Sequence, residues 1–182
     1  MRFLLRLKHW QLFTLVWGIP FGLNILLFFD TGFPIIAIFP VMTLLFTIGV
    51  YGWIWGISIE LHKKLPADVK LNVGQFKIVF TIPIVYMLAL TFWMINNIFS
   101  TLSGHSGENG ENMNVIGIII FIHLLSMVCI ILGLRFAAKT MKSVELGRMA
   151  NFGDYVGEFF LIWFSPVGVW ILQPRLNKLT DD

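Results

Sequence analysis

Three ionisable residues lie inside or beside apolar stretches of this chain, where a charge is costly unless it has a partner or a task. His123 lies about halfway along the uncharged run 115–134, and Asp154 and Glu158 open the apolar stretch 153–172. A histidine or carboxylate at such depth can relay protons or line an ion path. Because Asp154 and Glu158 are four residues apart, they share a helical face and can also bind a cation or act as an acid–base pair.

Each of the three residues also has a structural interpretation. A neutral His123 can hydrogen-bond to a neighbouring helix, and the carboxylates can pair with Arg148 or Arg135 at the membrane interface. Asp154 and Glu158 also suit the positive end of a helix that begins beside them. The sequence leaves both interpretations open. It contains no metalloprotease, phosphate-loop or catalytic-triad pattern, and one cysteine with four scattered histidines predicts no metal site. We therefore assign no catalytic, cofactor-binding or metal-ligating residue and expect no cofactor.

The composition places these residues in a membrane protein. The chain of 182 residues is 57% hydrophobic and 13% charged, whereas a soluble domain carries roughly 25% charged residues. So few charges cannot cover a soluble surface, which makes lipid the solvent for much of the chain. The net charge of +3 does not indicate nucleic acid, because the basic residues flank apolar runs. We expect one integral membrane domain over residues 1–182, with the lipid bilayer as a partner.

Four uncharged runs predict transmembrane helices near residues 10–29, 33–60, 77–99 and 114–136, since roughly 20 apolar residues cross a bilayer. The expected fold is an all-α helical bundle. Residues 136–149 are expected to continue as an amphipathic helix along the membrane surface. Small residues at helical spacing predict close helix packing on two of the runs; they are Thr14, Gly18 and Gly22 in the first, and Gly49, Gly52 and Gly56 in the second.

The 13 basic residues are distributed unevenly between the ends of these runs. Lysine and arginine precede the first run, occupy the loop 60–77 and follow the fourth run, whereas the segments 30–32 and 100–114 contain neither. Cytoplasmic loops carry the excess of lysine and arginine in membrane proteins. The pattern therefore predicts a cytoplasmic (inner) membrane protein with four crossings and a cytoplasmic N-terminus.

The apolar stretch 153–172 is interrupted at Ser165–Gly168. Pro166 cannot donate to the carbonyl four residues earlier, and Gly168 adds backbone freedom, so we expect the helix to break there. If the segment turns back, Arg175 and Lys178 lie on the same side as the other basic residues. We expect this re-entrant arrangement, docked on the groove of Gly49 and Gly52. The alternative is that the segment spans and the chain has five transmembrane helices.

Residues 46–53, with the sequence FTIGVYGW, resemble a Gly-Ile/Val-Tyr-x-x-Trp type of motif found in small bacterial multi-pass inner-membrane proteins that have no assigned activity. Residues 164–170 are a looser echo of the same motif. The resemblance covers only these two short stretches. It implies a bacterial inner-membrane protein and transfers no functional residue.

Three functions follow as expectations. The first is a non-enzymatic accessory, assembly or interaction subunit that packs with another membrane protein or with copies of itself. The second is a small transporter or channel subunit with a path through His123, Asp154 and Glu158. The third is a membrane-embedded enzyme with a lipid-like substrate. Short loops, small-residue helix faces and the absence of a decisive motif favour the first.

Overall fold

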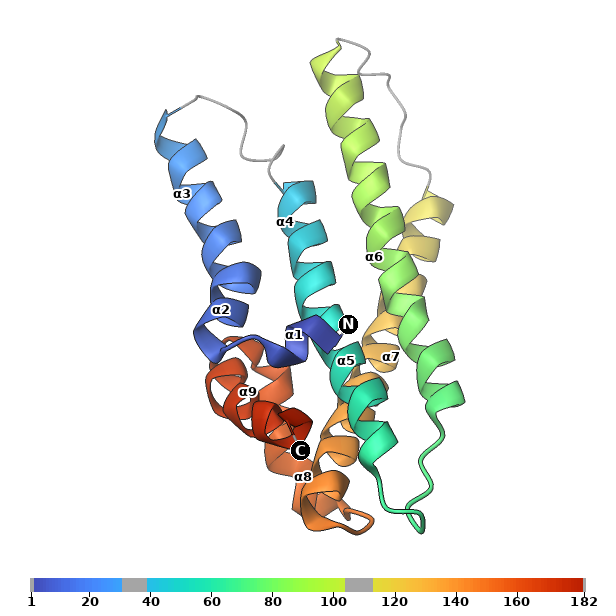
Figure 1. Cartoon of the computed structure of the whole chain (residues 1–182). Coiled ribbons are helices and arrows are strands. Elements are labelled where there is room, and N and C mark those ends of the chain that lie inside the picture. The colour runs from blue at the N-terminus through green and yellow to red at the C-terminus, as the bar shows by residue number, and fades with distance from the viewer. Residues whose placement is uncertain (1, 31–38, 104–112, 182) are drawn as a thin grey trace.

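All regular structure in the described part of the chain is helical (Figure 1). The computed structural model describes residues 2–30, 39–103 and 113–181. The expected all-α fold is confirmed. The expected loops at 30–32 and 100–114 lie largely outside the described residues.

The N-terminal half forms two long helices, each with a π-helical turn in its middle. After the short α1 (Arg2–Arg6), the first comprises α2 (His9–Phe13), η1 (Thr14–Gly18) and α3 (Ile19–Asp30). The second comprises α4 (Phe39–Phe46), η3 (Thr47–Tyr51) and α5 (Gly52–Glu60), and ends in the 3-10 turn η4 (Leu61–Lys64). The two π-helical turns pack together, with Val16 of η1 directly against Gly49 of η3.

The two longest helices follow, α6 (Val73–Leu102) and α7 (Met113–Leu146). At a rise of 1.5 Å per residue they are about 45 and 51 Å long, more than a hydrocarbon core of about 30 Å requires. Three helical stretches are long and apolar enough to cross a membrane: Phe39–Lys64, Val73–Thr101 and Gly117–Leu146. They correspond to the second, third and fourth expected spans. The first expected span is helical from His9 to Asp30 but is not among the three found in the described residues.

Residues 136–146 continue the helix as expected, because α7 runs without a break to Leu146. They do not lie along a surface as expected. Ala137, Ala138 and Met141 are fully buried in this extension, because its small and apolar residues follow one helical face that packs into the protein. The helix ends where Gly147 adopts a positive φ of 60°, the left-handed conformation that often terminates a helix at glycine.

The C-terminal segment is broken into α8 (Phe152–Trp163) and α9 (Ser165–Asp181). The break lies at Phe164 (φ −88°, ψ 55°), one residue before the expected Ser165–Gly168. Pro166 therefore lies in the first turn of α9, where a missing N–H is tolerated. Gly168 serves close packing and not backbone freedom: a Cβ there would collide with the carbonyl of Leu161, and its φ is not positive.

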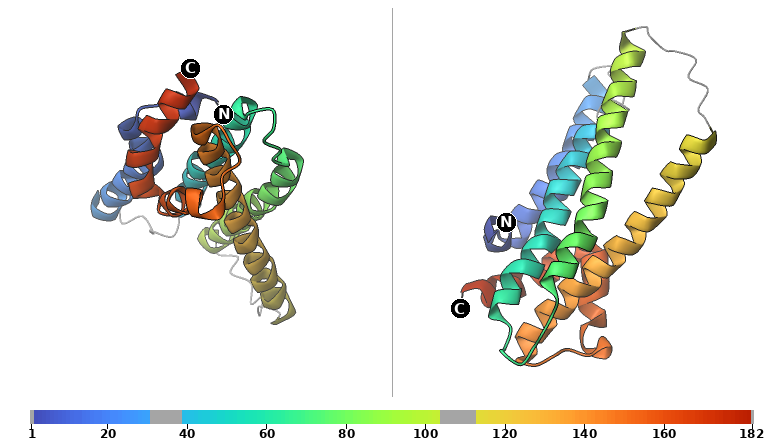
Figure 2. Two further views of the ribbon diagram at one scale, coloured as in Figure 1. Left: turned by 90° about the horizontal axis from the view of Figure 1, so that it is seen from below. Right: turned by 90° about the vertical axis from the view of Figure 1, so that its right-hand side faces the viewer.

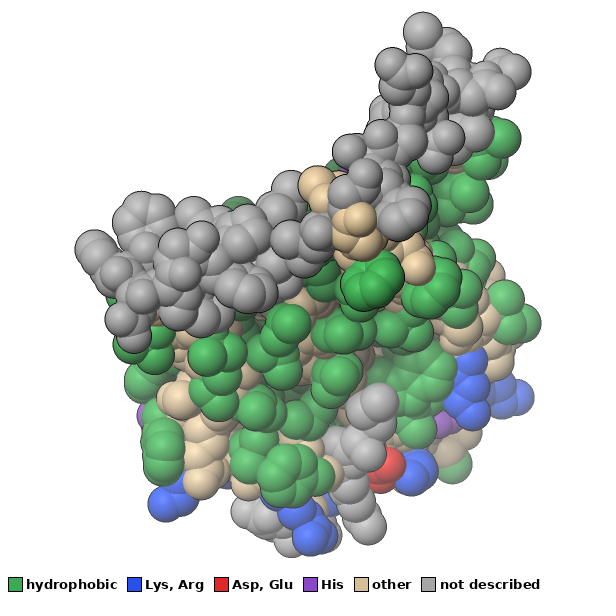
Figure 3. Space-filling view, turned by 90° about the horizontal axis from the view of Figure 1, so that it is seen from above, with side chains coloured by type: hydrophobic (Ala, Val, Ile, Leu, Met, Phe, Trp, Pro, Cys, Tyr) green, Lys and Arg blue, Asp and Glu red, His purple; other side chains and the backbone are tan. Residues whose placement is uncertain are grey.

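Both ends of the chain lie in the half of the bundle that contains α1, η4, the loop 65–72, the last turns of α7, and α8 and α9 (Figures 1 and 2). We call it the basic end. The Lys64 ammonium donates to the Leu179 carbonyl at 2.7 Å, so α9 returns to the level of η4. From the opposite end, apolar side chains cover most of the visible described surface and lysine and arginine lie around its rim (Figure 3).

Candidate functional site

Four charged side chains meet where α7, α8 and α9 come together at the basic end. Glu158 of α8 accepts from Arg175 of α9 at 2.6 Å and from Lys142 of α7 at 3.1 Å. Arg175 also donates two hydrogen bonds to Glu145 of α7, at 2.6 and 2.9 Å. Lys142 closes the ring by pairing with Glu145 at 3.2 Å. We call this group the four-charge cluster.

Local sequence explains how each member reaches the cluster. Lys142 and Glu145 are three residues apart and so share a face in the last turns of α7. Gly147 then ends α7, and Asn151 begins α8 as the N-cap of a capping box, so that Glu158 comes back alongside α7. Arg175 reaches Glu158 because the chain turns at Phe164 and α9 packs against α8. The cluster therefore depends on the hairpin of α8 and α9.

The Glu158 carboxylate is the most enclosed member, with only 8% of its side chain exposed. Burial alone would raise its pKa, but hydrogen bonds from Arg175, a backbone amide and Lys142 outweigh burial and hold the pKa of Glu158 below its ordinary value. Hydrogen bonds to Glu145 and Glu158 in turn raise the pKa of Arg175, against the opposing effect of burial. Glu158 and Arg175 thus stay charged at neutral pH.

The cluster is chemically closed. Two carboxylates face two cations, so every charge has an opposite partner and the sum is zero. A buried ion pair of this kind holds elements in register, and losing one partner is destabilising. Among the described residues there is also no group of three or more His, Cys, Asp and Glu that could hold a metal ion. The ion pairs join α7, α8 and α9, and they leave no charged group of the cluster unpaired for a substrate.

Asp154 lies outside the cluster. Its Oδ2 accepts from Arg148 at 3.0 Å and from the backbone N–H of Asn151 at 2.9 Å, so it caps α8 and pairs with one of the two arginines expected from the sequence. The Asn151 amide, and then the Arg148 guanidinium, hold the pKa of Asp154 below its ordinary value. Asp154 and Glu158 share a helix but have different partners, and they do not form an acid–base pair.

His123 is remote from both carboxylates. Lys142, which contacts Glu158, comes 19 residues after His123 on the same helix, a separation of about 28 Å at helical rise. The His123 ring is exposed, and its Nδ1 lies 3.2 Å from the Tyr86 hydroxyl of α6. The structure therefore does not bring His123, Asp154 and Glu158 into one site. His123 instead hydrogen-bonds to a neighbouring helix, which is the structural alternative that the sequence left open.

The small-residue faces differ in what they contact. A Cβ at Gly49 would press on Val16 of the first helix, and Gly52 and Gly56 are buried in α5. Nothing lies within 4 Å of a Cβ placed at Gly22, and Gly18 meets only Thr14 of its own helix. The close approach of the first two helices thus uses Val16 and Gly49, and the face of Thr14, Gly18 and Gly22 makes no comparable contact in the described residues.

Gln173 is a central polar residue that sequence reasoning missed. It is fully buried in α9, and its Oε1 accepts from the Trp53 indole at 2.8 Å. Its Nε2 lies within hydrogen-bond distance of the carbonyls of Leu4, Leu5 and Leu7, at 2.8–3.1 Å. One amide thereby joins the N-terminal segment, α5 and α9. The only signal was a lone amide after the apolar run that ends at Leu172.

No protein-family model matches this chain, and searches of the curated proteins and of the solved structures return no match. The functional argument therefore depends on the arrangement of its own residues.

Proposed function

We propose that this chain is a multi-pass protein of the cytoplasmic membrane that acts as a non-enzymatic accessory subunit, by lateral association with another membrane component. The observation that carries the proposal is the uneven burial of the three candidate spans. The most apolar stretch of Phe39–Lys64 is 56% buried within the protein, but those of Val73–Thr101 and Gly117–Leu146 are only 17% and 22% buried. Two of the three spans thus leave most of their surface to whatever surrounds the chain.

The geometry of α6 and α7 supports association. The two helices diverge towards the ends that lie away from the basic end (Figure 2), so they do not cover each other's flanks. Large apolar side chains project from both, including Phe92 at 69% and Phe121 at 68% exposure. Lipid chains can cover such apolar faces. A helix of another protein that fits against α6 and α7 would gain additional van der Waals contact in the bilayer.

The proposed topology has four crossings, made by the helix His9–Asp30 and the three candidate spans. It places the basic end in the cytoplasm. The positive-inside bias supports this orientation, because the basic residues that precede α2, follow α5 and end α7 all lie at that end. The contact of Lys64 with Leu179 supports a re-entrant α8 and α9 and a cytoplasmic C-terminus. The resemblance of residues 46–53 to a motif of bacterial inner-membrane proteins agrees with this location.

The other two functions receive less support. An ion path through His123, Asp154 and Glu158 requires these groups to converge, but the carboxylates are occupied by ion pairs far along α7 from the histidine. An enzyme requires a nucleophile or base aimed into a cavity. Of the described cavities, the one between α5, α6, α7 and α8, of about 290 Å³, is lined almost entirely by apolar side chains.

Site-specific photo-crosslinking in cell membranes tests the proposal. A benzophenone amino acid is introduced at Phe92 of α6, at Phe121 of α7, or at the equally exposed Phe21 of α3 as the matched control. We expect one protein adduct of defined mass from Phe92 and Phe121 but not from Phe21, and co-purification of the same species in mild detergent. The absence of any protein adduct from α6 and α7, or identical adducts from all three positions, would contradict lateral association through these helices.

A further inference from the structure

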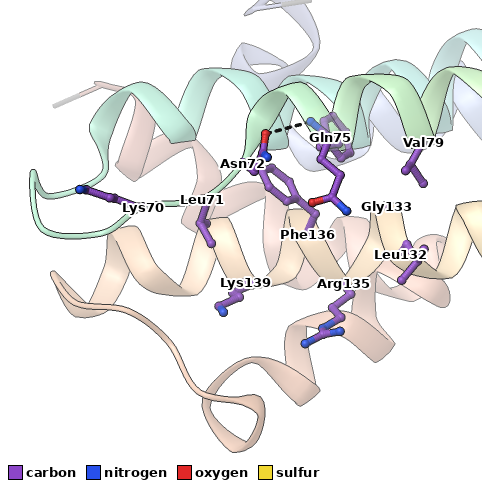
Figure 4. Close-up of a pocket in the computed structure, with 11 residues that line it drawn as sticks. Lys70, Leu71, Asn72, Gln75, Val79, Leu132, Gly133, Arg135, Phe136 and Lys139 are labelled. Atoms are coloured by element: carbon purple, nitrogen blue, oxygen red, sulfur yellow. Dashed lines mark hydrogen bonds between the residues drawn. The ribbon is translucent and has the colours of Figure 1, made fainter.

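A cleft of about 300 Å³ opens between the first turns of α6 and the last turns of α7, at the basic end (Figure 4). Three of its lining residues are cations: Lys70 from the loop before α6, and Arg135 and Lys139 from α7. The amide side chain of Gln75 points from α6 towards α7 (Figure 4). No carboxylate is among the residues that line the cleft.

Both walls of the cleft change from basic to apolar in the same direction. Along α7, Lys139 lies nearest the basic end, Phe136 and Arg135 follow, and Leu132 is deepest; on the other wall, Lys70 of the preceding loop is followed by Phe76 and then Val79 of α6. Phe76 and Phe136 stack across the cleft with their centroids 4.7 Å apart. The cavity is therefore amphiphilic, with a cationic mouth and an apolar floor that runs towards the membrane interior.

The cations of the cleft are available, unlike those of the four-charge cluster. Among the described residues, Lys70 and Lys139 make no ion pair or side-chain hydrogen bond. Arg135 donates from Nε to the Tyr155 hydroxyl at 3.0 Å, which fixes the guanidinium and leaves its terminal N–H groups for a ligand. The positive end of the α6 dipole lies at the same mouth and favours an anion.

We propose that this cleft binds the phosphate group of an anionic phospholipid, with the acyl chains along the apolar floor between α6 and α7. Basic pockets between transmembrane helices on the cytoplasmic side are suited to such headgroups. The depth agrees: counted from Gly117 at helical rise, Arg135 lies about 27 Å and Lys139 about 33 Å along the span, which places both at the edge of a hydrocarbon core of about 30 Å. The inference rests on the membrane placement of the proposed function and is independent of any protein partner.

The test measures lipid retention by native mass spectrometry and by transfer to nanodiscs. The full-length protein is titrated with phosphatidylglycerol or with phosphatidylcholine, and compared with the variant K70Q/R135Q/K139Q. The matched control is K63Q/K77Q/K178Q, which removes the same charge outside the cleft. We expect a stoichiometric phosphatidylglycerol that the cleft variant binds about a hundredfold more weakly, little retention of phosphatidylcholine, and binding by the control variant close to wild type.

Three results would overturn the proposal. Equal losses in the cleft and control variants would mean diffuse surface electrostatics, and unchanged binding in both would exclude the cleft. Displacement of the lipid by micromolar glycerol 3-phosphate, bound at the same residues, would identify a soluble phosphate compound as the ligand. Circular dichroism of each variant in detergent establishes folding, and Arg135→Lys, which keeps the charge, separates a folding defect from loss of binding. Because binding is measured on the isolated chain, its failure is independent of the crosslinking result.

Discussion

Replacing Gln173 by methionine should destabilise the protein strongly although it keeps the length and nearly the volume of the side chain. The Gln173 amide is fully buried and is the only described side chain that accepts from the Trp53 indole. Its Nε2 has two protons for the carbonyls of Leu4, Leu5 and Leu7, which it reaches at 3.0, 3.1 and 2.8 Å. Methionine fills the space but satisfies none of these groups.

The expected magnitude follows from the groups left without partners. The Trp53 indole N–H is buried, at 1% exposure for the whole residue, and a buried donor without a partner costs about 1–3 kcal/mol. The carbonyls of Leu4 and Leu5 lose the Gln173 donor, whereas that of Leu7 keeps the Asn177 amide at 3.2 Å. Each lost hydrogen bond costs about 0.5–1.5 kcal/mol. We expect Gln173→Met to lower the free energy of unfolding by about 2–4 kcal/mol.

Denaturation in a mild detergent, followed by circular dichroism, measures this loss. The matched control is Gln75→Met, because the Gln75 side chain is exposed, and it should change the free energy of unfolding by less than about 0.5 kcal/mol. In a double-mutant cycle, Trp53→Phe removes the indole donor, so the pair Q173M/W53F should be less destabilised than the sum by about 1 kcal/mol. If Gln173→Met is no worse than Gln75→Met, or the cycle shows no coupling, the proposed role of Gln173 is refuted.

Four further outcomes are expected. Glu158→Gln should lower the free energy of unfolding by about 2 kcal/mol in denaturation followed by circular dichroism, since it leaves the partly buried Arg175 and Lys142 with one partner fewer each; no loss would contradict the structural role of the cluster. Because the folded pKa of Glu158 lies below its ordinary 4.5, its stabilisation should be complete at neutral pH and be lost as pH falls below about 4.5; a flat profile between pH 7 and 3 in which Glu158→Gln does not differ from wild type would contradict this. Gly168→Ala should abolish folding of the C-terminal hairpin, whereas Gly157→Ala on α8, with open space at its Cβ, should be tolerated, as limited proteolysis would show. His123→Leu should leave stability and expression nearly unchanged, and a loss of folding would mean that the Tyr86 contact matters more than its exposure suggests.

Hydrophobicity and charge along the sequence were enough to predict the all-helical fold and three of the candidate membrane spans. The uncharged runs 33–59, 78–99 and 115–134 predict helices because lipid requires every backbone group to be satisfied within the segment, and the structure has the long apolar helices Phe39–Lys64, Val73–Thr101 and Gly117–Leu146. The break near Pro166 was also predictable from a missing N–H. The exact residue, Phe164, was not, since proline is accepted in the first turn of the following helix.

Packing partners were not predictable, because they depend on which helix faces which. The spacing of Thr14, Gly18 and Gly22 assumes a regular α-helix, but η1 is π-helical over Thr14–Gly18 and shifts the following residues around the axis. Gln173 and Trp53 are 120 residues apart, so no local pattern connects them. Likewise, Arg175 becomes the partner of Glu158 only after α9 has returned along α8.

The basic end carries two kinds of basic residue, those paired with carboxylates and those of the cleft proposed to bind lipid. The positive-inside bias counts lysine and arginine whether or not they are paired. At this end Glu145, Asp154 and Glu158 are paired with cations of α7, of the following loop and of α9, which holds the C-terminal hairpin in place. Lys70 and Lys139, on the wall of the α6–α7 cleft, are left without such partners in the described residues. Carboxylates of α7 and α8 thus neutralise the structural cations, whereas Lys70 and Lys139 lie at the mouth of an apolar cleft, where the proposed phospholipid would bring its phosphate.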